Sequence, residues 1–416
     1  SQCTIKKIGD MESFKEDQIT KTIDLNGKIV LPGMICSHSH FYGQFVRGVP
    51  LKASPVNWQQ ILAQIWWEVD KALTHEQLYY SAMTAIIEGI KAGTTTYIDH
   101  NASPTACSGS LDVLEKAVLD TGVRACLAYE VSDRDGEGAC WEGIKENARF
   151  IKKTNNEHSP NVKGTFGLHA SYTLSDKTLD VCSGMAKELG VGFHLHVAED
   201  IADVTDSYRK AGAHVVDRVN KYGILGPKTI AAHCVHVGPE QWEIFKATDT
   251  KVAHNCQSNT NNSVGISPVY QMLKSGIRVA LASDGYTYDM FKELSFASIL
   301  QRLANKDPRI MSLNDLKNFT FENNFEIANI FFNKKLGELK EGNLADFIVI
   351  AYEPPTPLNS DNLFSHLTSG FSGNVDTVVV GGQVLLRNKK LLNIDEEEIF
   401  AKSREEAKKL WKKICY

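Results

Sequence analysis

The 416-residue sequence has no excess of basic residues. Lysine and arginine total 45 against 50 aspartate and glutamate, which gives a net charge of −5. Nucleic acids and anionic membranes bind proteins through clustered positive charge. The composition therefore argues against both kinds of partner.

Two further features are missing. No apolar run approaches the roughly 18 residues that identify a membrane helix, and the N-terminal stretch SQCTIKKIGDMESFKED is too polar for a signal peptide. The cysteines number nine, an odd count, and show no C-x-x-C spacing, so neither a disulfide framework nor a zinc finger is indicated. We expect a soluble, cytoplasmic protein with reduced thiols.

What the sequence does contain is an alternation of short apolar segments with longer stretches of helical spacing, several ending in glycine. Glycine suits the left-handed conformation after a helix, and strands that alternate with helices are typical of parallel sheets. The apolar segments span residues 28–37, 94–99, 123–129, 162–168, 191–196, 229–233, 250–254 and 277–284. Eight such units predict an α/β fold, a (β/α)8 TIM-type barrel.

The two ends of the chain differ from this pattern. Residues 4–10, 19–28, 345–357 and 375–392 are strand-like with turn residues between them. We expect a small β-sandwich domain built from both termini, residues 1–31 and 344–392, around a barrel at 32–343. Acidic residues early and basic residues late in 393–416 predict a C-terminal amphipathic helix.

Polar residues end every predicted barrel strand. In such a barrel the carboxyl ends of all strands meet on one face, so residues far apart in sequence can form one site. In chain order they are His38 and His40, Asp99 and His100, Glu130, His169, His196, His233, His254 and Asp284.

A metal site is one interpretation of this set. The pair His38-x-His40 alone is weak evidence, because such pairs are more often accidental. A third imidazole at His196 and a carboxylate at Asp284 complete a donor set that suits a catalytic zinc or iron ion. Glu199 adds a carboxylate able to move a water proton.

Longer strings support this interpretation. The sequence resembles the amidohydrolase superfamily, in its branch of cytosine deaminases, S-adenosylhomocysteine deaminases and chlorohydrolases, and within it the SsnA aminohydrolase subgroup. The matching strings, in the family's order, are LPGMICSHSHFYGQFVRG, EGIKAGTTTYID, FGLHASYTLSD, HLHVAED, AAHCVHV, HNCQSNTNN and ALASDGYT.

The resemblance implies roles for individual residues. One divalent metal, zinc before iron, would be held by His38, His40, His196 and Asp284. Glu199 would shuttle protons together with Asp284, and His233 would orient the attacking water. His169 would contact the substrate, with Gln44 and His100 as weaker candidates. Lys163 begins rather than ends the fourth strand, so no carbamylated lysine is expected and the site should hold one metal.

Three functions remain open at this point. Hydrolytic deamination of a purine-like heterocycle is favoured, because Glu199 and His233 are both present whereas dechlorinating members can lack them. The alternatives are opening of a cyclic amide by the same metal site and a non-catalytic ligand-binding scaffold. We expect a small-molecule substrate and a homo-oligomer.

Several other residues are expected to be structural. We expect His194 to point away from His196 and pack against the helices, and His236 to be structural. Trp66 and Trp67 follow an apolar helical pattern and should be helix core.

Overall fold

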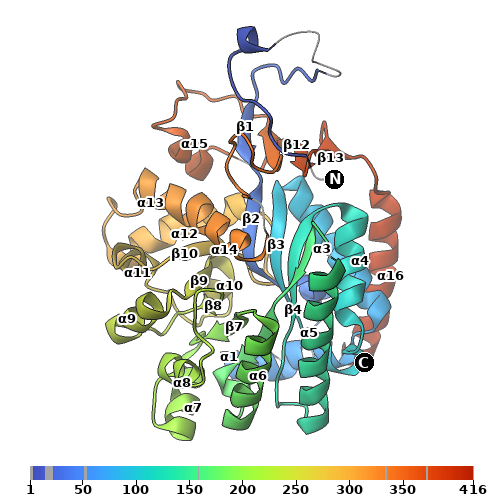
Figure 1. The fold of residues 1–416 in the computed structure, drawn as a ribbon, viewed down its shortest axis with the longest axis vertical. Helices are drawn as coiled ribbons and strands as arrows, with labels where there is room; N and C mark the ends of the chain where they lie inside the picture. The colour runs from blue at the N-terminus through green and yellow to red at the C-terminus, as the bar shows by residue number, and fades with distance from the viewer. Residues whose placement is uncertain are drawn as a thin grey trace.

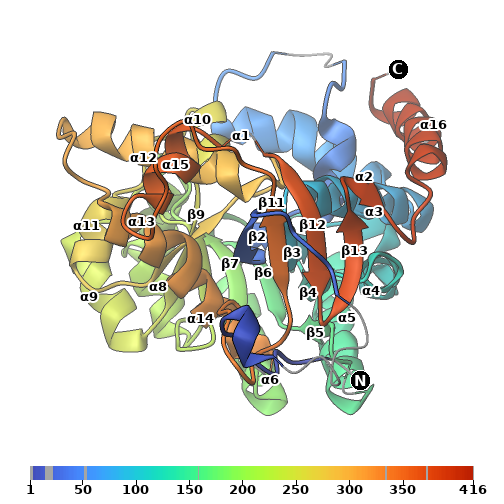
Figure 2. The ribbon, with the colours of Figure 1, turned by 90° about the horizontal axis from the view of Figure 1, so that it is seen from above.

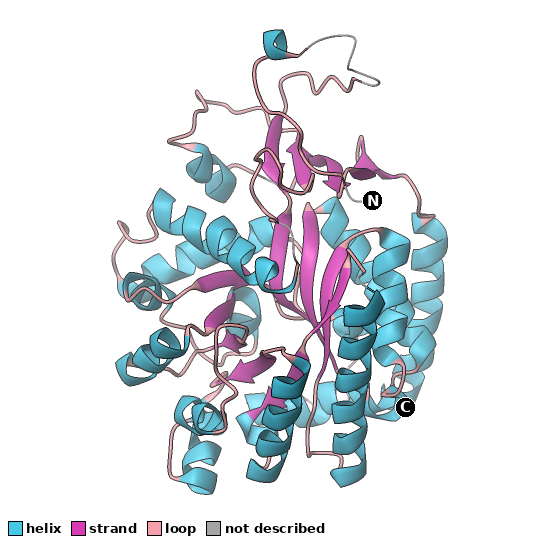
Figure 3. Cartoon of the chain, viewed as in Figure 1, coloured by secondary structure: helices cyan, strands magenta, loops and turns pink. Residues whose placement is uncertain are grey.

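A ring of parallel strands forms the centre of the molecule and helices surround it (Figure 1, Figure 3). The computed structural model describes residues 3–14, 22–50, 54–157, 159–332, 335–371 and 373–415. The strands of the ring are β2 (Met34–Ser39), β3 (Thr94–Asn101), β4 (Arg124–Tyr129), β5 (Val162–Gly164), β6 (Phe166–Ala170), β7 (Phe193–Val197), β8 (Ile230–His233), β9 (Lys251–Asn255) and β10 (Val279–Ala282).

These strands close into an eight-membered barrel. β5 pairs with β4 while β6 pairs with β7, so the two short strands together fill the fourth position. Parallel bridges between Ser39 and Asp284 and between Val131 and Leu168 join the two halves of the ring. The predicted (β/α)8 barrel is confirmed.

Several helices end at glycine, as predicted, and the starts of some are capped by side chains. Thr74 and Gln77 form a capping box at the start of α3 (His75–Lys91), and α4 (Ser110–Thr121) and α6 (Asp176–Leu189) both end at a left-handed glycine. The other helices around the barrel are α5 (Glu137–Glu157), α7 (Ile201–Ala211), α8 (Val215–Lys221), α9 (Pro239–Thr248), α10 (Cys256–Asn261), α11 (Val269–Lys274), α12 (Met290–Asn305), α13 (Leu313–Lys317), α14 (Asn323–Phe331) and α15 (Leu363–Ser369).

A second group of helical segments follows β2. It comprises a 3-10 helix η3 (Phe41–Val46), α1 (Trp58–Ile61), a π-helical turn η4 (Leu62–Trp66) and α2 (Trp67–Ala72). The long helix α16 (Glu396–Cys415) lies beside α2 and α3. Its Trp411 indole Nε1 donates to the carbonyl of Phe45 at 2.7 Å, and its Lys413 Nζ to that of Ala72 at 3.0 Å. The C-terminal helix therefore supports the segment between β2 and α3.

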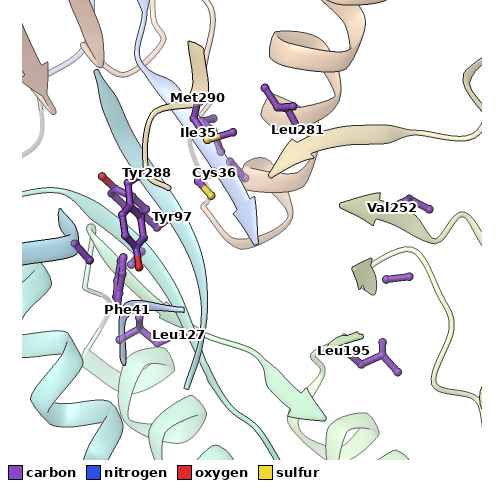
Figure 4. Close-up of a cluster of buried hydrophobic side chains, with 14 of the residues drawn as sticks. Ile35, Cys36, Phe41, Tyr97, Leu127, Leu195, Val252, Leu281, Tyr288 and Met290 are labelled. Carbon is purple, nitrogen blue, oxygen red and sulfur yellow. The ribbon is translucent and has the colours of Figure 1, made fainter. Parts of the chain in front are cut away.

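The hydrophobic core fills the space between strands and helices (Figure 4). Phe41 and Tyr97 pack edge to face with ring centroids 5.2 Å apart, and Tyr288 lies beside both. The Tyr288 hydroxyl donates to the carbonyl of His40 at 2.9 Å. The core thus fixes the backbone at the end of β2.

A five-stranded antiparallel sheet adjoins the start of β2 (Figure 1, Figure 2). Its strands are β1 (Ile29–Pro32), β11 (Phe347–Ile350), β12 (Val375–Val380), β13 (Gln383–Arg387) and β14 (Lys390–Leu391). The single segment predicted at 28–37 is therefore two strands in two sheets. They part at Gly33, where a Cβ atom would lie 2.3 Å from the Thr95 hydroxyl oxygen, so only glycine fits.

The small domain differs from the predicted sandwich. Its described residues form one sheet, to which residues 4–10 add only a bridge from Thr4 to Leu344. Residues 5–10 are mostly exposed and include Lys6 and Lys7, so they cannot form a buried second layer. Within the predicted strand 19–28, residues 22–28 contain a turn and no strand, and 19–21 lie outside the described residues.

A buried ion pair joins this sheet to the barrel. Arg124, at the start of β4, holds Asp346 with two bonds of 2.6 and 3.0 Å, and both side chains are almost fully buried. The same carboxylate accepts from the backbone amide of Gly381 at 2.5 Å. Among the described residues, no helix has both the length and the hydropathy that crossing a bilayer requires.

Candidate metal and active site

The predicted ligands converge at the carboxyl ends of the strands. The Nε2 atom of His40 lies 3.0 Å from Oδ1 of Asp284 and 3.2 Å from Nε2 of His196. The Nε2 atom of His38 lies 3.7 Å from the same carboxylate oxygen. Residues from β2, β7 and the end of β10 thus meet at one point, as expected.

The other ring nitrogens of these histidines are already engaged. His40 donates from Nδ1 to the carbonyl of His100 at 2.6 Å, and His196 from Nδ1 to that of His169 at 2.9 Å. Metal-binding histidines are commonly oriented by such a bond on the remote nitrogen. Each ring therefore presents its Nε2 atom to the common centre.

His194 corrects a sequence prediction. Residues two apart on a strand point to the same side, so His194 shares the inner face of β7 with His196 instead of facing the helices. It is fully buried, and its Nε2 lies 2.7 Å from Nδ1 of His38.

The donor set fits a divalent metal. Nε2 of His38 is buried and has no hydrogen-bond partner among the described residues, a costly state that an ion would relieve. His38, His40 and Asp284 have ligand atoms within 4.8 Å of one another, and so do His38, His196 and His233. Imidazoles with one carboxylate suit zinc or iron. An overlapping group, His40, His100, Glu130 and His196, meets the same distance limit.

Two groups hold the Asp284 carboxylate in addition to the neighbouring histidines. Ser258 Oγ donates to Oδ2 at 2.5 Å and the Gly285 amide to Oδ1 at 2.8 Å. Burial opposes ionisation, but the hydrogen bond and charge of His40 outweigh it and hold the pKa of Asp284 well below its usual value. Burial alone would lower the pKa of His40, but the hydrogen bond and charge of Asp284 raise it to about 9.

The backbone is strained where the site residues leave their strands. Ala198, His233, Cys234 and Asp284 have φ angles of 47°, 71°, 48° and 59°. A left-handed conformation costs a non-glycine residue about 1–3 kcal/mol and tends to occur at functional sites. The surrounding barrel must therefore hold these turns in place.

Glu199 and His233 lie together beside the proposed ligands. Their Oε2 and Nε2 atoms are 3.8 Å apart. Nδ1 of His233 donates to Oδ1 of Asn259 at 2.7 Å, which leaves Nε2 facing Glu199. Burial raises the pKa of Glu199, and a hydrogen bond from Trp58 partly opposes the rise. A raised pKa brings this carboxyl closer to neutral pH, as a general acid and base requires.

A narrow cavity of about 50 Å³ opens onto these groups. His169, predicted to contact substrate, is part of its wall, with Nδ1 2.5 Å from the Thr173 hydroxyl. Neither Gln44 nor His100 is among the described residues of the wall. Gln44 instead accepts from Arg47 at 3.4 Å, and the His100 ring is fully buried beneath the ligand histidines.

Part of the cavity wall consists of residues that were not predicted from the sequence to lie there. Trp58, Trp66, Trp67 and Asp70 come from the segment between β2 and α3 and line the cavity. Trp66 and Trp67 were expected in helix core. An apolar helical pattern looks the same whether it packs on protein or on a ligand site, so the sequence carried no signal to separate the two. His236, by contrast, is structural as expected, with Nε2 2.8 Å from the carbonyl of Val264.

A buried charge cluster forms another part of the wall, next to the proposed metal ligands. Arg134 lies within hydrogen-bond distance of Asp70, and its Nη1 donates to Glu130 at 3.1 Å. Its guanidinium also lies 5.5 Å from the Trp67 ring centroid, a favourable cation–π position. Glu130 in turn lies 3.6 Å from Nε2 of His169. Arg134 is thus neutralised by protein carboxylates.

A closed parallel barrel with histidines and carboxylates at its strand ends is typical of metal-dependent hydrolases. A model of the amidohydrolase family matches residues 29–385, and the chain belongs to that family.

Individual relatives cover nearly the whole chain. A 5'-deoxyadenosine deaminase of Methanocaldococcus jannaschii is 31% identical over 406 residues, 96% of this chain and 93% of its own. A 5-methylthioadenosine/S-adenosylhomocysteine deaminase of Thermoanaerobacter pseudethanolicus is 30% identical over 413 residues. The match covers 98% of this chain and 92% of that protein. Among solved structures, a zinc-bound adenosine deaminase from Xanthomonas campestris matches with a TM-score of 0.83 at 21% identity, covering 92% of this chain and 85% of its own.

Proposed function

We propose that this protein is a metal-dependent hydrolase that deaminates a purine-like heterocycle. Water adds to the ring carbon that carries the amino group, the carbon–nitrogen bond breaks, and ammonia leaves. The observation that carries the proposal is the meeting of three imidazole Nε2 atoms with Asp284 beside Glu199 and His233. Membership of the amidohydrolase family supports it.

His38, His40, His196 and Asp284 would hold one divalent ion, which we propose to be zinc. When bound, such an ion lowers the pKa of water from about 15.7 to about 7 and stabilises negative charge.

Glu199 would carry the protons. Its buried carboxylate lies beside His233 and on the cavity wall, where it can accept a proton from the attacking water and return it to the leaving nitrogen. His233, oriented through Asn259, would hold the water at its Nε2 atom.

The composition of the cavity wall favours an aromatic substrate. Three tryptophans and His169 offer flat apolar surfaces and a ring nitrogen, which suit a nitrogen heterocycle. The deaminases of adenosine derivatives among the relatives support an aminopurine ring as the class.

A substrate panel tests the proposal. Zinc-loaded protein would be incubated with adenosine, 5'-deoxyadenosine, adenine, guanine and cyclic ureides, with ammonia and product mass as readouts. Release of ammonia from an aminopurine, with amine exchanged for oxygen, is expected. A product heavier by one whole water would indicate ring opening instead, and no turnover of any compound would favour a binding scaffold.

We also propose a homo-oligomer that works in the cytoplasm. Phe296, Ile299 and Leu303 are exposed at helical spacing on α12 and offer an apolar strip against which a second copy can pack. The nine cysteines are all free thiols, which suits the reducing cytoplasm. Light scattering with size exclusion on wild type and Leu303→Glu tests the oligomer, and fractionation of the source cells tests the location.

A further inference from the structure

We propose that His194 is a positioning residue for the metal site: it accepts a hydrogen bond from His38 and thereby directs the lone pair of His38 to the ion. This inference rests on the proposed metal site, in which His38 is a ligand. His194 itself would not touch the ion.

The geometry sets which ring donates. Nδ1 of His38 and Nε2 of His194 are 2.7 Å apart, so one carries a proton and the other a lone pair. A His38 ring that binds an ion through Nε2 must carry its proton on Nδ1. Nε2 of His194 must then be the acceptor, which fixes His194 as the neutral ring with its proton on Nδ1.

The surroundings leave His38 dependent on this bond. Both rings are fully buried, so water cannot replace the partner. The rings meet nearly at right angles, with an interplanar angle of 80° and centroids 4.8 Å apart, which points one nitrogen at the other.

His38 differs in this from the other two histidines. His40 and His196 are oriented by the backbone carbonyls of His100 and His169, which no side-chain substitution removes. His38 is oriented by a side chain. A single substitution at His194 can therefore release one proposed ligand while the other three keep their partners.

The test measures zinc affinity in metal-free protein, using Zn²⁺ alone in competition with a chromophoric chelator. His194→Phe keeps the ring volume but has no acceptor, and we expect its zinc Kd to rise about 10- to 100-fold, the usual cost of losing such a partner. His194→Gln supplies a carbonyl oxygen that can accept, and we expect its Kd to be closer to wild type than that of His194→Phe. If His194→Phe does not fold, His194→Leu replaces it.

His254→Phe is the matched control. His254 is equally buried and lies near the end of β9, and neither of its ring nitrogens has a partner within the described part of the chain. Its replacement should leave the zinc Kd within about twofold of wild type.

Two outcomes would overturn the inference. One is an unchanged Kd in His194→Phe, and the other is a loss as large in His194→Gln as in His194→Phe, which would point to packing. Failure of the proposed function appears differently: wild type would then bind no zinc equivalent, or His196→Ala would bind as tightly as wild type.

Discussion

The backbone amide of Asp284 donates a hydrogen bond to the carbonyl oxygen of His38 at 3.0 Å. This bond belongs to the seam where the last barrel strand meets the first. Two of the four proposed ligands are thus neighbours because the barrel closes, although they are far apart in the sequence. The proposed metal site and the closure of the fold therefore depend on the same contact.

Zinc binding should release a proton from His40. With a pKa of about 9 in the metal-free protein, His40 carries a proton below that pH, and a metal ligand must give it up. We expect close to one proton released per zinc at about pH 7.5 from this residue, and less as the pH rises past about 9. Calorimetry in buffers of different ionisation enthalpy measures the number. A release that did not change between about pH 7 and pH 10 would contradict the assignment.

Replacing Glu199 by glutamine should stop proton transfer while keeping the fold. The amide retains the size of the side chain but cannot accept a proton from water, so we expect kcat to fall by about 10²- to 10⁴-fold with metal content unchanged. Because burial raises the pKa of Glu199, wild-type activity should be lost as the pH falls through that raised value. The acidic limb of kcat/KM should be missing in the variant. Turnover within a few-fold of wild type would contradict the proposed role of Glu199 in proton transfer.

His169→Asn should weaken substrate binding and spare the metal. The ring lies on the cavity wall and its backbone carbonyl, which orients His196, is retained in the variant. We expect KM to rise or kcat/KM to fall, with one zinc still bound. Steady-state kinetics and metal analysis on the same sample check this. Loss of zinc along with activity would instead make the side chain a ligand.

Arg124→Met should destabilise the protein by about 3–5 kcal/mol, because it leaves the buried Asp346 carboxylate without its cation. Chemical denaturation measures the free energy of unfolding. Lys177→Ala, which breaks an exposed pair with Glu137, is the control and should leave the free energy of unfolding close to that of wild type. Equal losses in the two variants would show that burial of the pair does not matter.

The barrel and its donor set were predictable from the sequence because each strand ends in a polar residue at a fixed place in the repeat. His38, His40, His196, Glu199, His233 and Asp284 all lie at the strand ends where they were expected. The supporting residues were harder to foresee. Ser258 and Asn259 lie on the short helix α10 and hold Asp284 and His233, a pairing that depends on the three-dimensional path of one loop.

The errors have specific causes. His194 was placed on the wrong face of β7. Residues two apart on a strand share a face, so His194 lies on the same side as His196. The substrate contact of Gln44 stays a prediction, since η3 turns its side chain toward Arg47 in this structure. Trp66 and Trp67 were assigned to the core because apolar spacing alone does not identify the surface against which a helix packs.

The seam between His38 and Asp284 also sets an order of events during protein synthesis. The ribosome makes β2 and β7 well before β10, so the growing chain exposes three imidazoles before their carboxylate exists. In the proposed site, an ion held by those imidazoles cannot gain its fourth protein ligand until Asp284 has left the ribosome and β10 has paired with β2. Stable metal acquisition should therefore be a late event in the life of the nascent chain.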